Sequence, residues 1–392
     1  MRAGPWLRLC GLGATATVVA VVASGELGLT HRALVLVALP LLVAMVLGAW
    51  FAHRRAFPYA AAALALFLAA VASWWAPVLH VTLAAVAAAT TAVATAQLYR
   101  GRPPARVAWR DYVTLTKPRI MSLLLLTGAA GMFVGAQGVP DLDQLAAMLA
   151  GLALACGGAS ALNHLLDRDV DRSMKRTSSR PVADGRVSPE LALEFGLALS
   201  ALSFVLLAST LNTLTACLAL VGNLFYVLVY TRWLKRSTPQ NIVIGGAAGA
   251  VPPLVGYAAA TGNLALPALY LFLIVFFWTP PHFWALALLI KRDYAAAKIP
   301  MLPVVRGDRE TARQVLLYTV LLVTLTLVPV LTGTFGVLYL VAASLLGAQF
   351  IRLALRLRRS TVPAQAGRLF HYSLAYLALL FVAMAIDPMV VL

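Results

Sequence analysis

Charged residues are scarce in this chain. Only 11% of its 392 residues are Asp, Glu, Lys or Arg, and 61% are hydrophobic. Soluble domains carry about 25% charged residues, so this composition excludes an ordinary soluble protein. It predicts a polytopic membrane protein.

Acidic residues are rarer still, with 14 Asp and Glu against 31 Lys and Arg. A net charge of +17 could indicate a nucleic-acid partner. However, the basic residues lie in short segments between apolar runs, which is the pattern of cytoplasmic loops in membrane proteins. We therefore expect the bilayer, and no nucleic acid, as the surrounding partner.

Cysteine is also nearly absent. The three cysteines, Cys10, Cys156 and Cys217, lie within or beside apolar runs. Their spacing matches neither a metal site nor a disulfide framework. We interpret them as small core residues.

The chain is rich in apolar runs of about 17–25 residues, the length that crosses a bilayer as a helix. Thirteen are expected, at 8–24, 32–51, 58–76, 79–98, 119–136, 143–164, 189–209, 212–230, 242–260, 266–290, 313–332, 335–351 and 369–387. The first could pass for a signal peptide, but the second follows within ten residues, which favours a retained helix. The fold class is all-α.

A polar break at 99–118 contains Pro-Pro and clustered Arg and indicates a linker. It divides the chain into a four-helix N-terminal membrane domain, 1–105, and a nine-helix domain, 106–392. If the N-terminus is cytoplasmic, 30 of the 31 Lys and Arg fall on the cytoplasmic side and only Arg32 lies opposite. This asymmetry supports thirteen spans with the large polar loops in the cytoplasm.

The first large loop begins with three oxygen-bearing side chains in helical register. Asn163, Asp167 and Asp171 are spaced i, i+4 and i+8, so on a helix they share one face over about 12 Å. With Arg176 and Arg180 beyond them, they suit a Mg²⁺–diphosphate group. The alternative is a solvated loop that is merely charged, but a register that starts inside an apolar run favours a site.

Two further segments add candidates. Lys235 ends a span, and the Gly- and Pro-rich stretch 242–256 after it predicts an irregular helix that lines a cavity. Asp293 follows a long apolar run much as Asp167 follows its own. Within that run His282 lies deeper than an interfacial aromatic belt, which favours a cavity role over an anchoring role.

These segments together resemble the UbiA superfamily of intramembrane aromatic prenyltransferases, and within it the branch that farnesylates haem. The resemblance covers about 108–392. It rests on TKPRI at 116–120, NHLLDRDVD at 163–171, RTSSRP at 176–181, YTRWLKR at 230–236, TPQNIVIGGAAGA at 238–250, WTPPHFW at 278–284 and the DY…PMLPV segment at 293–304.

The resemblance implies nine helices around a central cavity and Mg²⁺-dependent transfer of a farnesyl group from farnesyl diphosphate to a vinyl carbon of haem B, giving haem O. It assigns metal binding and catalysis to Asn163, Asp167, Asp171 and Asp293, and diphosphate binding to Lys117, Arg176, Arg180 and Lys235. From their own chemistry we add three substrate contacts: Trp278 and Trp284, whose aromatic faces can stabilise an allylic cation, and His282, for its place in the cavity. The superfamily often repeats the aspartate of the second loop at i+4, where this chain has Ala297.

The resemblance also implies a plasma-membrane location, with the N-terminus and the active-site loops in the cytoplasm, and a haem A synthase as a partner. A quinone precursor or another aromatic acceptor is the alternative substrate. A transporter is disfavoured, because we see no inverted-repeat half-helices.

Residues 1–105 resemble half of a haem A synthase, a family that binds haem through paired histidines on a four-helix bundle. This implies His31 and His80 as axial haem ligands. The other interpretation is that both are interfacial histidines near helix ends.

Overall fold

The computed structural model describes residues 57–72 and 107–390, together with isolated positions at 14, 38, 42, 43, 46, 87, 90, 91 and 93. The predicted domain boundary at 105, His31, His80 and most of the first four apolar runs lie outside the described residues. Helix α3 (Phe57–Ala72) matches the third of those runs. The described part of the chain is helical and contains no strand.

Nine helices between 118 and 389 are long and apolar enough to cross a membrane. They are α6 (Pro118–Ala136), α7 (Leu142–Leu166), α9 (Pro189–Thr210), α10 with η1 and α11 (Thr213–Ser237), α12 with α13 (Asn241–Thr261), α14 (Leu266–Leu289), α17 (Gly307–Leu331), α18 (Val337–Arg359) and α19 with η2 (Pro363–Met389). The nine C-terminal spans expected from the sequence are confirmed. The last three run several residues further at their charged ends, where polar helix turns continue beyond the apolar stretch.

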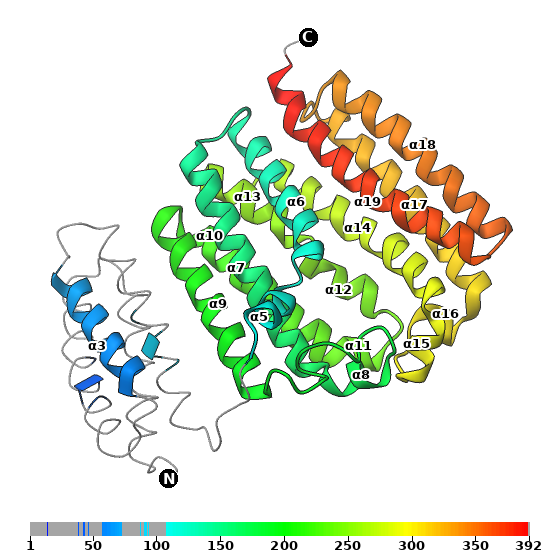
Figure 1. The fold of residues 1–392 in the computed structure, drawn as a ribbon. Coiled ribbons are helices and arrows are strands. Elements are labelled where there is room, and N and C mark those ends of the chain that lie inside the picture. The colour runs from blue at the N-terminus through cyan, green and yellow to red at the C-terminus, as the bar shows by residue number, and fades with distance from the viewer. Residues whose placement is uncertain are drawn as a thin grey trace.

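Successive spans run in opposite directions, so alternate loops gather at the same end of the bundle (Figure 1). One end carries the short helices α5 (Trp109–Thr116), α8 (Arg168–Ser173), α15 (Lys291–Ala296) and α16 (Leu302–Val305). We call it the loop end. Every Lys and Arg of residues 107–390 lies at or near it, so the charge asymmetry predicted from the sequence is a property of the fold.

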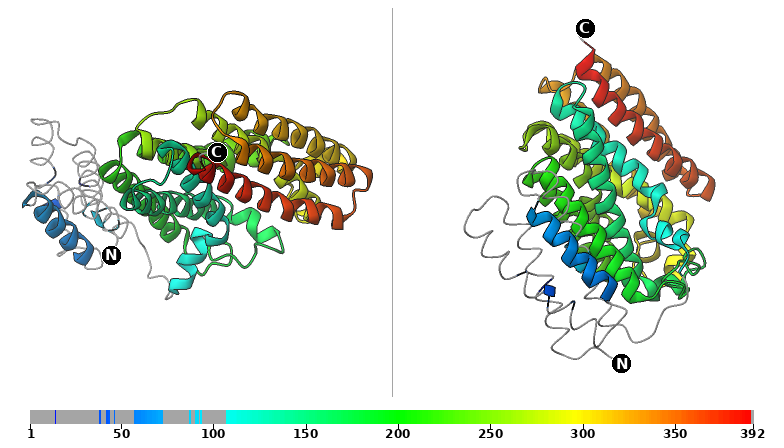
Figure 2. Two further views of the ribbon diagram at one scale, coloured as in Figure 1. Left: turned by 90° about the horizontal axis from the view of Figure 1, so that it is seen from above. Right: turned by 60° about the vertical axis from the view of Figure 1, so that its left-hand side comes forward.

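The spans pack side by side into one bundle, as the two views of Figure 2 show. Helix α7 packs on α9, α6 on α13, and α14 on both α17 and α19. Helix α19 also contacts α6, which brings the last span against the first of the nine.

Glycines allow the α6–α13 pair to approach at backbone distance. A Cβ on Gly256 would lie 1.8 Å from the carbonyl oxygen of Gly128, and one on Gly131 would lie 2.3 Å from that of Pro253. Small residues at such crossings let helices pack closely where lipid supplies no hydrophobic driving force. This close crossing holds α6 and α13 in a fixed position relative to each other.

The Gly- and Pro-rich stretch predicted to be irregular is broken in the structure. Helix α12 (Asn241–Gly249) is separated by Ala250 from α13 (Val251–Thr261), which has Pro252 and Pro253 in its first turn. Proline donates no backbone hydrogen bond, so it fits the first turn of a new helix. The break lies inside the bundle, where neighbouring helices surround it.

Candidate functional site

The acidic motif lies at the junction of α7 and α8. Helix α7 ends at Leu166, and Asp167 joins it to α8 with φ −93° and ψ 2°. Helical hydrogen bonds nevertheless continue, because the N–H of Asp167 donates to the carbonyl of Asn163 at 2.9 Å and the N–H of Asp171 to that of Asp167 at 2.7 Å. The backbone hydrogen-bond pattern of the predicted helix therefore continues through the junction, although Asp171 makes its contacts apart from Asn163 and Asp167.

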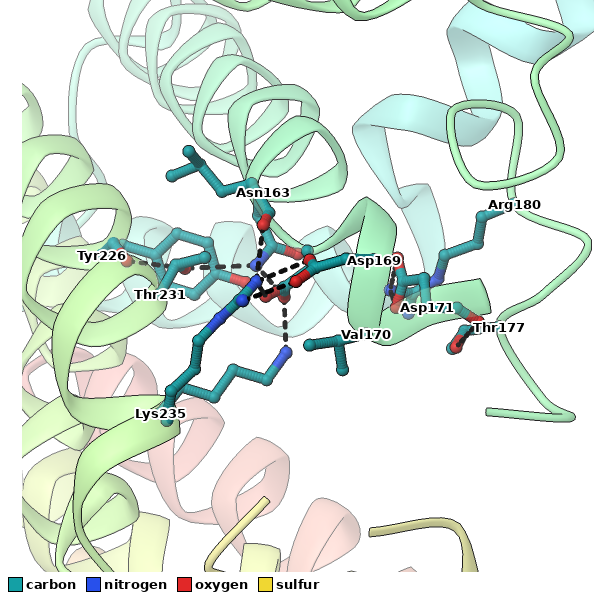
Figure 3. Close-up of polar contacts among 12 residues, drawn as sticks. Asn163, Asp169, Val170, Asp171, Thr177, Arg180, Tyr226, Thr231 and Lys235 are labelled. Carbon is teal, nitrogen blue, oxygen red and sulfur yellow. Dashed lines mark hydrogen bonds and ion pairs between the residues drawn. The ribbon is translucent and has the colours of Figure 1, made fainter. Parts of the chain in front are cut away.

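Two lysines from other parts of the chain lie against Asn163 and Asp167, and Figure 3 shows Lys235 reaching toward the motif. Lys117 Nζ donates to Asn163 Oδ1 at 2.7 Å, and Lys235 Nζ donates to Asp167 Oδ2 at 2.5 Å. The Asn163 amide links the two pairs, since its Nδ2 donates to Asp167 Oδ2 at 2.8 Å and to Thr231 Oγ1 at 3.1 Å. We call these four residues, Lys117, Asn163, Asp167 and Lys235, the lysine–aspartate cluster.

Lys117 occupies an unusual backbone position. It joins α5 to α6 with a left-handed conformation, φ 51° and ψ 61°. Burial lowers the pKa of its ammonium group to about 7, with further lowering by Arg180 and Lys235, while Asp167 and Asp171 oppose the shift. An anion bound beside Lys117 would favour the charged form, so anion binding and full protonation of this lysine reinforce each other.

Asp171 is buried on the other side of α8, paired with Arg180 (Figure 3). Arg180 Nη1 lies 2.8 and 2.9 Å from the two carboxylate oxygens. Among the described residues, no three His, Cys, Asp or Glu side chains gather closely enough to hold a metal ion. The structure thus brings Asn163 and Asp167 together, and their sharing a metal with Asp171 and Asp293 stays a prediction.

Asp293 and Arg176 make no side-chain hydrogen bond or ion pair with the described part of the chain. The pKa of Tyr294, the residue after Asp293, is affected by charged residues of both acidic loops. Burial raises the pKa of its phenol, Arg176 and Arg180 lower it, and Asp167 and Asp293 raise it. Tyr294 therefore lies within electrostatic reach of both loops; the sequence marked it only as part of the segment at 293–304, with no role of its own.

Asp169 belongs to a separate contact. Arg236 donates to both of its carboxylate oxygens, at 2.7 and 2.8 Å, and to the carbonyl of Leu166 at 2.7 Å. The hydrogen bond from Arg236 is the main cause that lowers the pKa of Asp169 to about 2. This exposed pair ties the first loop to the end of the fourth span.

The donor atoms of the lysine–aspartate cluster fit a hard divalent cation. Asp167 is fully buried, and its Oδ1 accepts no hydrogen bond, with Arg236 Nη2 at 3.7 Å. A buried carboxylate oxygen without a partner is costly in the protein alone. Carboxylate and amide oxygens are the ligands that Mg²⁺ prefers, so Asp167 and Asn163 are suitable ligands.

The fourth span changes to a π-helix beside the cluster. Segment η1 (Phe225–Leu234) carries Thr231, whose hydroxyl donates to the carbonyl of Tyr226 at 2.9 Å and accepts from Asn163. The Tyr230 ring of the same segment lies against Gly245, where an added Cβ would be 2.3 Å from the ring. π-helical turns occur often at functional sites, but the sequence carries no signal for this one.

The predicted aromatic site divides into two places. Trp278 and His282 lie together on α14 against α19: the Trp278 indole N–H donates to the carbonyl of Ser373 at 2.8 Å, and His282 Nδ1 lies 2.7 Å from Ser373 Oγ. Trp284 instead packs edge-on against Tyr318 at 5.2 Å. It lines a cavity of about 240 Å³ together with Pro239, Gln240, Leu302, Arg306, Glu310, Gln314 and Tyr318.

Comparisons with known proteins identify the family of the chain. Residues 124–382 match the model of the UbiA prenyltransferase family. A protein from Symbiobacterium thermophilum named protoheme IX farnesyltransferase is 54% identical over 280 residues, which are 71% of this chain and 94% of that protein. One of the same name from Roseiflexus sp. is 51% identical over 72% of this chain, and the chain spans only 53% of its length.

A solved structure shares the fold. It is a UbiA homologue from Archaeoglobus fulgidus bound to DMAPP and Mg²⁺, with a TM-score of 0.54 and 18% sequence identity. The match covers 70% of this chain and 99% of that one.

Proposed function

Because the chain belongs to the UbiA prenyltransferase family, we propose that it transfers a farnesyl group from farnesyl diphosphate to a vinyl carbon of haem B. The C–O bond to the diphosphate breaks, a C–C bond to the outer vinyl carbon forms, and water supplies a hydroxyl to the inner carbon, giving haem O, diphosphate and a proton. The observation that carries the proposal is the buried lysine–aspartate cluster at the end of an apolar bundle.

The lysine–aspartate cluster provides positive charge for a departing diphosphate. Lys117 and Lys235 present ammonium groups, and Arg180 adds a guanidinium that can bind phosphate oxygens through two N–H groups. Fixed cations of this kind favour the transition state, because negative charge concentrates on the diphosphate as the C–O bond breaks. Arg176, exposed and without a partner among the described residues, is placed to join them.

We assign Mg²⁺ binding to Asn163 and Asp167, with Asp171 and Asp293 as the further ligands. When bound, Mg²⁺ neutralises charge that develops on the leaving diphosphate. The A. fulgidus homologue, which shares the fold, was solved with Mg²⁺, and this supports Mg²⁺ as the metal.

The apolar interior supports the other half of the reaction. An allylic cation reacts with water unless the site is dry, and the buried aromatic residues of α14, among them Trp278, border the bundle core below the loops. Aromatic faces also attract a cation through their quadrupole. Trp284 lies in the separate cavity described above, so we place the cation near Trp278 and Phe283 instead.

We further propose that the loop end faces the cytoplasm of a cell whose plasma membrane holds the protein. Lys and Arg concentrate on cytoplasmic loops, and in residues 107–390 all of them lie at or near the loop end. The farnesyl chain makes haem O lipophilic, so a haem A synthase in the same bilayer is the expected consumer of the product.

Expression of the chain in membranes that contain haem B tests the activity. We expect an extracted pigment with the mass of the farnesyl-hydroxyethyl derivative, measured by liquid chromatography and mass spectrometry. Unchanged haem B in membranes that hold the folded protein and farnesyl diphosphate would contradict the proposal. A farnesylated quinone precursor in the same extracts would support the alternative acceptor.

A further inference from the structure

We propose that Nε2 of His282 is the axial ligand that holds the iron of the haem acceptor. The inference rests on the proposed function and names the residue that positions the porphyrin. It involves a coordinate bond only, so the oxidation state of the iron does not change. The argument depends on the tautomer, the orientation and the accessibility of this ring.

Ser373 determines the tautomer. Its hydroxyl donates its one proton to the carbonyl of Phe370 at 2.7 Å. With the hydroxyl proton on that carbonyl, we assign the contact of 2.7 Å between Ser373 Oγ and His282 Nδ1 to donation by the imidazole. Nδ1 therefore carries the proton of the neutral ring, and Nε2 carries the free electron pair.

This is the arrangement found behind metal-bound histidines. Such a histidine almost always donates its other ring N–H to an oxygen, which fixes the tautomer and makes the ligating nitrogen more basic. A neutral imidazole is also the usual proximal ligand of haem iron. Ser373, on the last span, supplies that supporting oxygen from 91 residues away.

Aromatic stacking holds the ring in one orientation. Trp278 covers the imidazole at a centroid distance of 4.4 Å and an interplanar angle of 17°, and Phe370 stacks with it at 4.8 Å and 25°. The Trp278 indole is fixed in turn by its hydrogen bond to Ser373. The ring plane is therefore set before any ligand binds, so less ordering is needed when one does.

Of the three histidines in the described residues, only His282 combines burial with an available nitrogen. Its Nε2 has no hydrogen-bond partner there, yet it is not sealed off, and the residue keeps 7% exposure. Both ring nitrogens of His164 are sealed without partners. His371 lies on the exposed surface of α19, with Nδ1 bonded to the carbonyl of Gly367.

The depth of His282 suits the acceptor. It lies seven residues before the end of α14 at Leu289, or about 10 Å along the axis from the loop end. A porphyrin held there would lie within the apolar part of the bundle, and the diphosphate would lie above it at the lysine–aspartate cluster. The farnesyl group would then enter the same apolar region as the vinyl carbon.

The test is haem ligation by the full-length protein in lipid nanodiscs, titrated with ferric haem B. His31→Ala, His53→Ala and His80→Ala are present in every sample, so that the N-terminal region contributes no histidine ligand of its own. We expect optical and electron paramagnetic resonance spectra of imidazole-ligated haem. His282→Ala should lose this signature, and added imidazole should restore it. His371→Ala, the matched control, should leave it unchanged.

Two further variants guard against a folding defect. His282→Met keeps a side chain of similar bulk and should replace the imidazole signature with that of a thioether ligand. Ser373→Ala removes the supporting oxygen and should weaken haem affinity by about 10–100-fold, the usual effect of losing such a partner.

The outcomes separate the two proposals. If His282→Met binds haem with an unaltered imidazole signature, the axial assignment is overturned, while the proposed function stands as long as haem O is still made. If the protein with intact His282 takes up no haem B and makes no haem O, the proposed function fails, and the assignment fails with it.

Discussion

Asp167 is the residue on which the candidate site depends most. It is fully buried, accepts from both Asn163 and Lys235, and keeps one oxygen without a hydrogen bond. We expect Asp167→Ala to lower the rate of farnesyl transfer by about 10²–10³-fold or more, since it removes a charge that acts when the diphosphate leaves. Rates in purified membranes with a fixed amount of folded protein would measure this.

Asp169→Asn is the matched control for that substitution. Asp169 lies two residues away, is exposed and pairs only with Arg236. Exposed ion pairs contribute about 0–1 kcal/mol, so activity should stay close to that of the unmodified chain. Near-normal activity in Asp167→Ala would remove the metal and diphosphate assignment.

Some of these residue positions could be predicted from the sequence, and others could not. The spacing of Asn163, Asp167 and Asp171 predicts their register, because local helix geometry alone determines it. The roles of Thr231, Tyr294 and Ser373 could not be predicted, because each depends on a contact with a distant segment. Trp278 and Trp284 differ in surroundings although six residues separate them, since each meets a different neighbouring helix.

At the level of elements, the α6–α13 crossing carries a clear prediction. Gly256→Ala would place a methyl group inside contact distance of the Gly128 carbonyl, and backbone cannot move aside as a side chain can. We expect a loss of about 1–3 kcal/mol in stability, the usual cost of overpacking. Thermal unfolding of the detergent-solubilised protein, followed by loss of soluble monomer, would report it.

Gly249→Ala provides the comparison. A Cβ there meets no heavy atom within 4 Å, and the position is helical. Alanine is favoured over glycine in helices by about 1 kcal/mol, so this variant should unfold at the same temperature or slightly higher. Equal destabilisation by both substitutions would show that the crossing is not as tight as described.

The sequence predicted the membrane-spanning helices better than it predicted their irregular segments. The nine C-terminal spans follow from apolar runs, because burial in lipid demands them. The π-helical segment η1 was not predictable, since residues 225–234 read as the end of an ordinary apolar run that is followed by the basic residues Lys235 and Arg236. Its geometry depends on packing against α7 and α12, including the contact of Tyr230 with Gly245.

For the whole molecule, the charge asymmetry predicts the orientation in the membrane. In a variant whose native cysteines are replaced, we expect Ser360→Cys at the loop end to react with a membrane-impermeant maleimide only after the cells are opened. Asn263→Cys, on the short loop between α13 and α14 at the opposite end, should react in intact cells. The reverse labelling pattern would place the loop end outside the cell.

The pairing of the site's charges has a consequence for the order of events. Each buried carboxylate of the first loop is matched by a cation: Lys235 for Asp167 and Arg180 for Asp171. An anion that bound these cations without a metal would leave both carboxylates without an ion-pair partner. A metal ion that bound without an anion would leave the lysine and the arginine without one. Only a ligand that carries both a cation and an anion provides a new partner for the two carboxylates and for Lys235 and Arg180. We therefore expect the resting protein to bind a metal–diphosphate complex in preference to free phosphate or free metal.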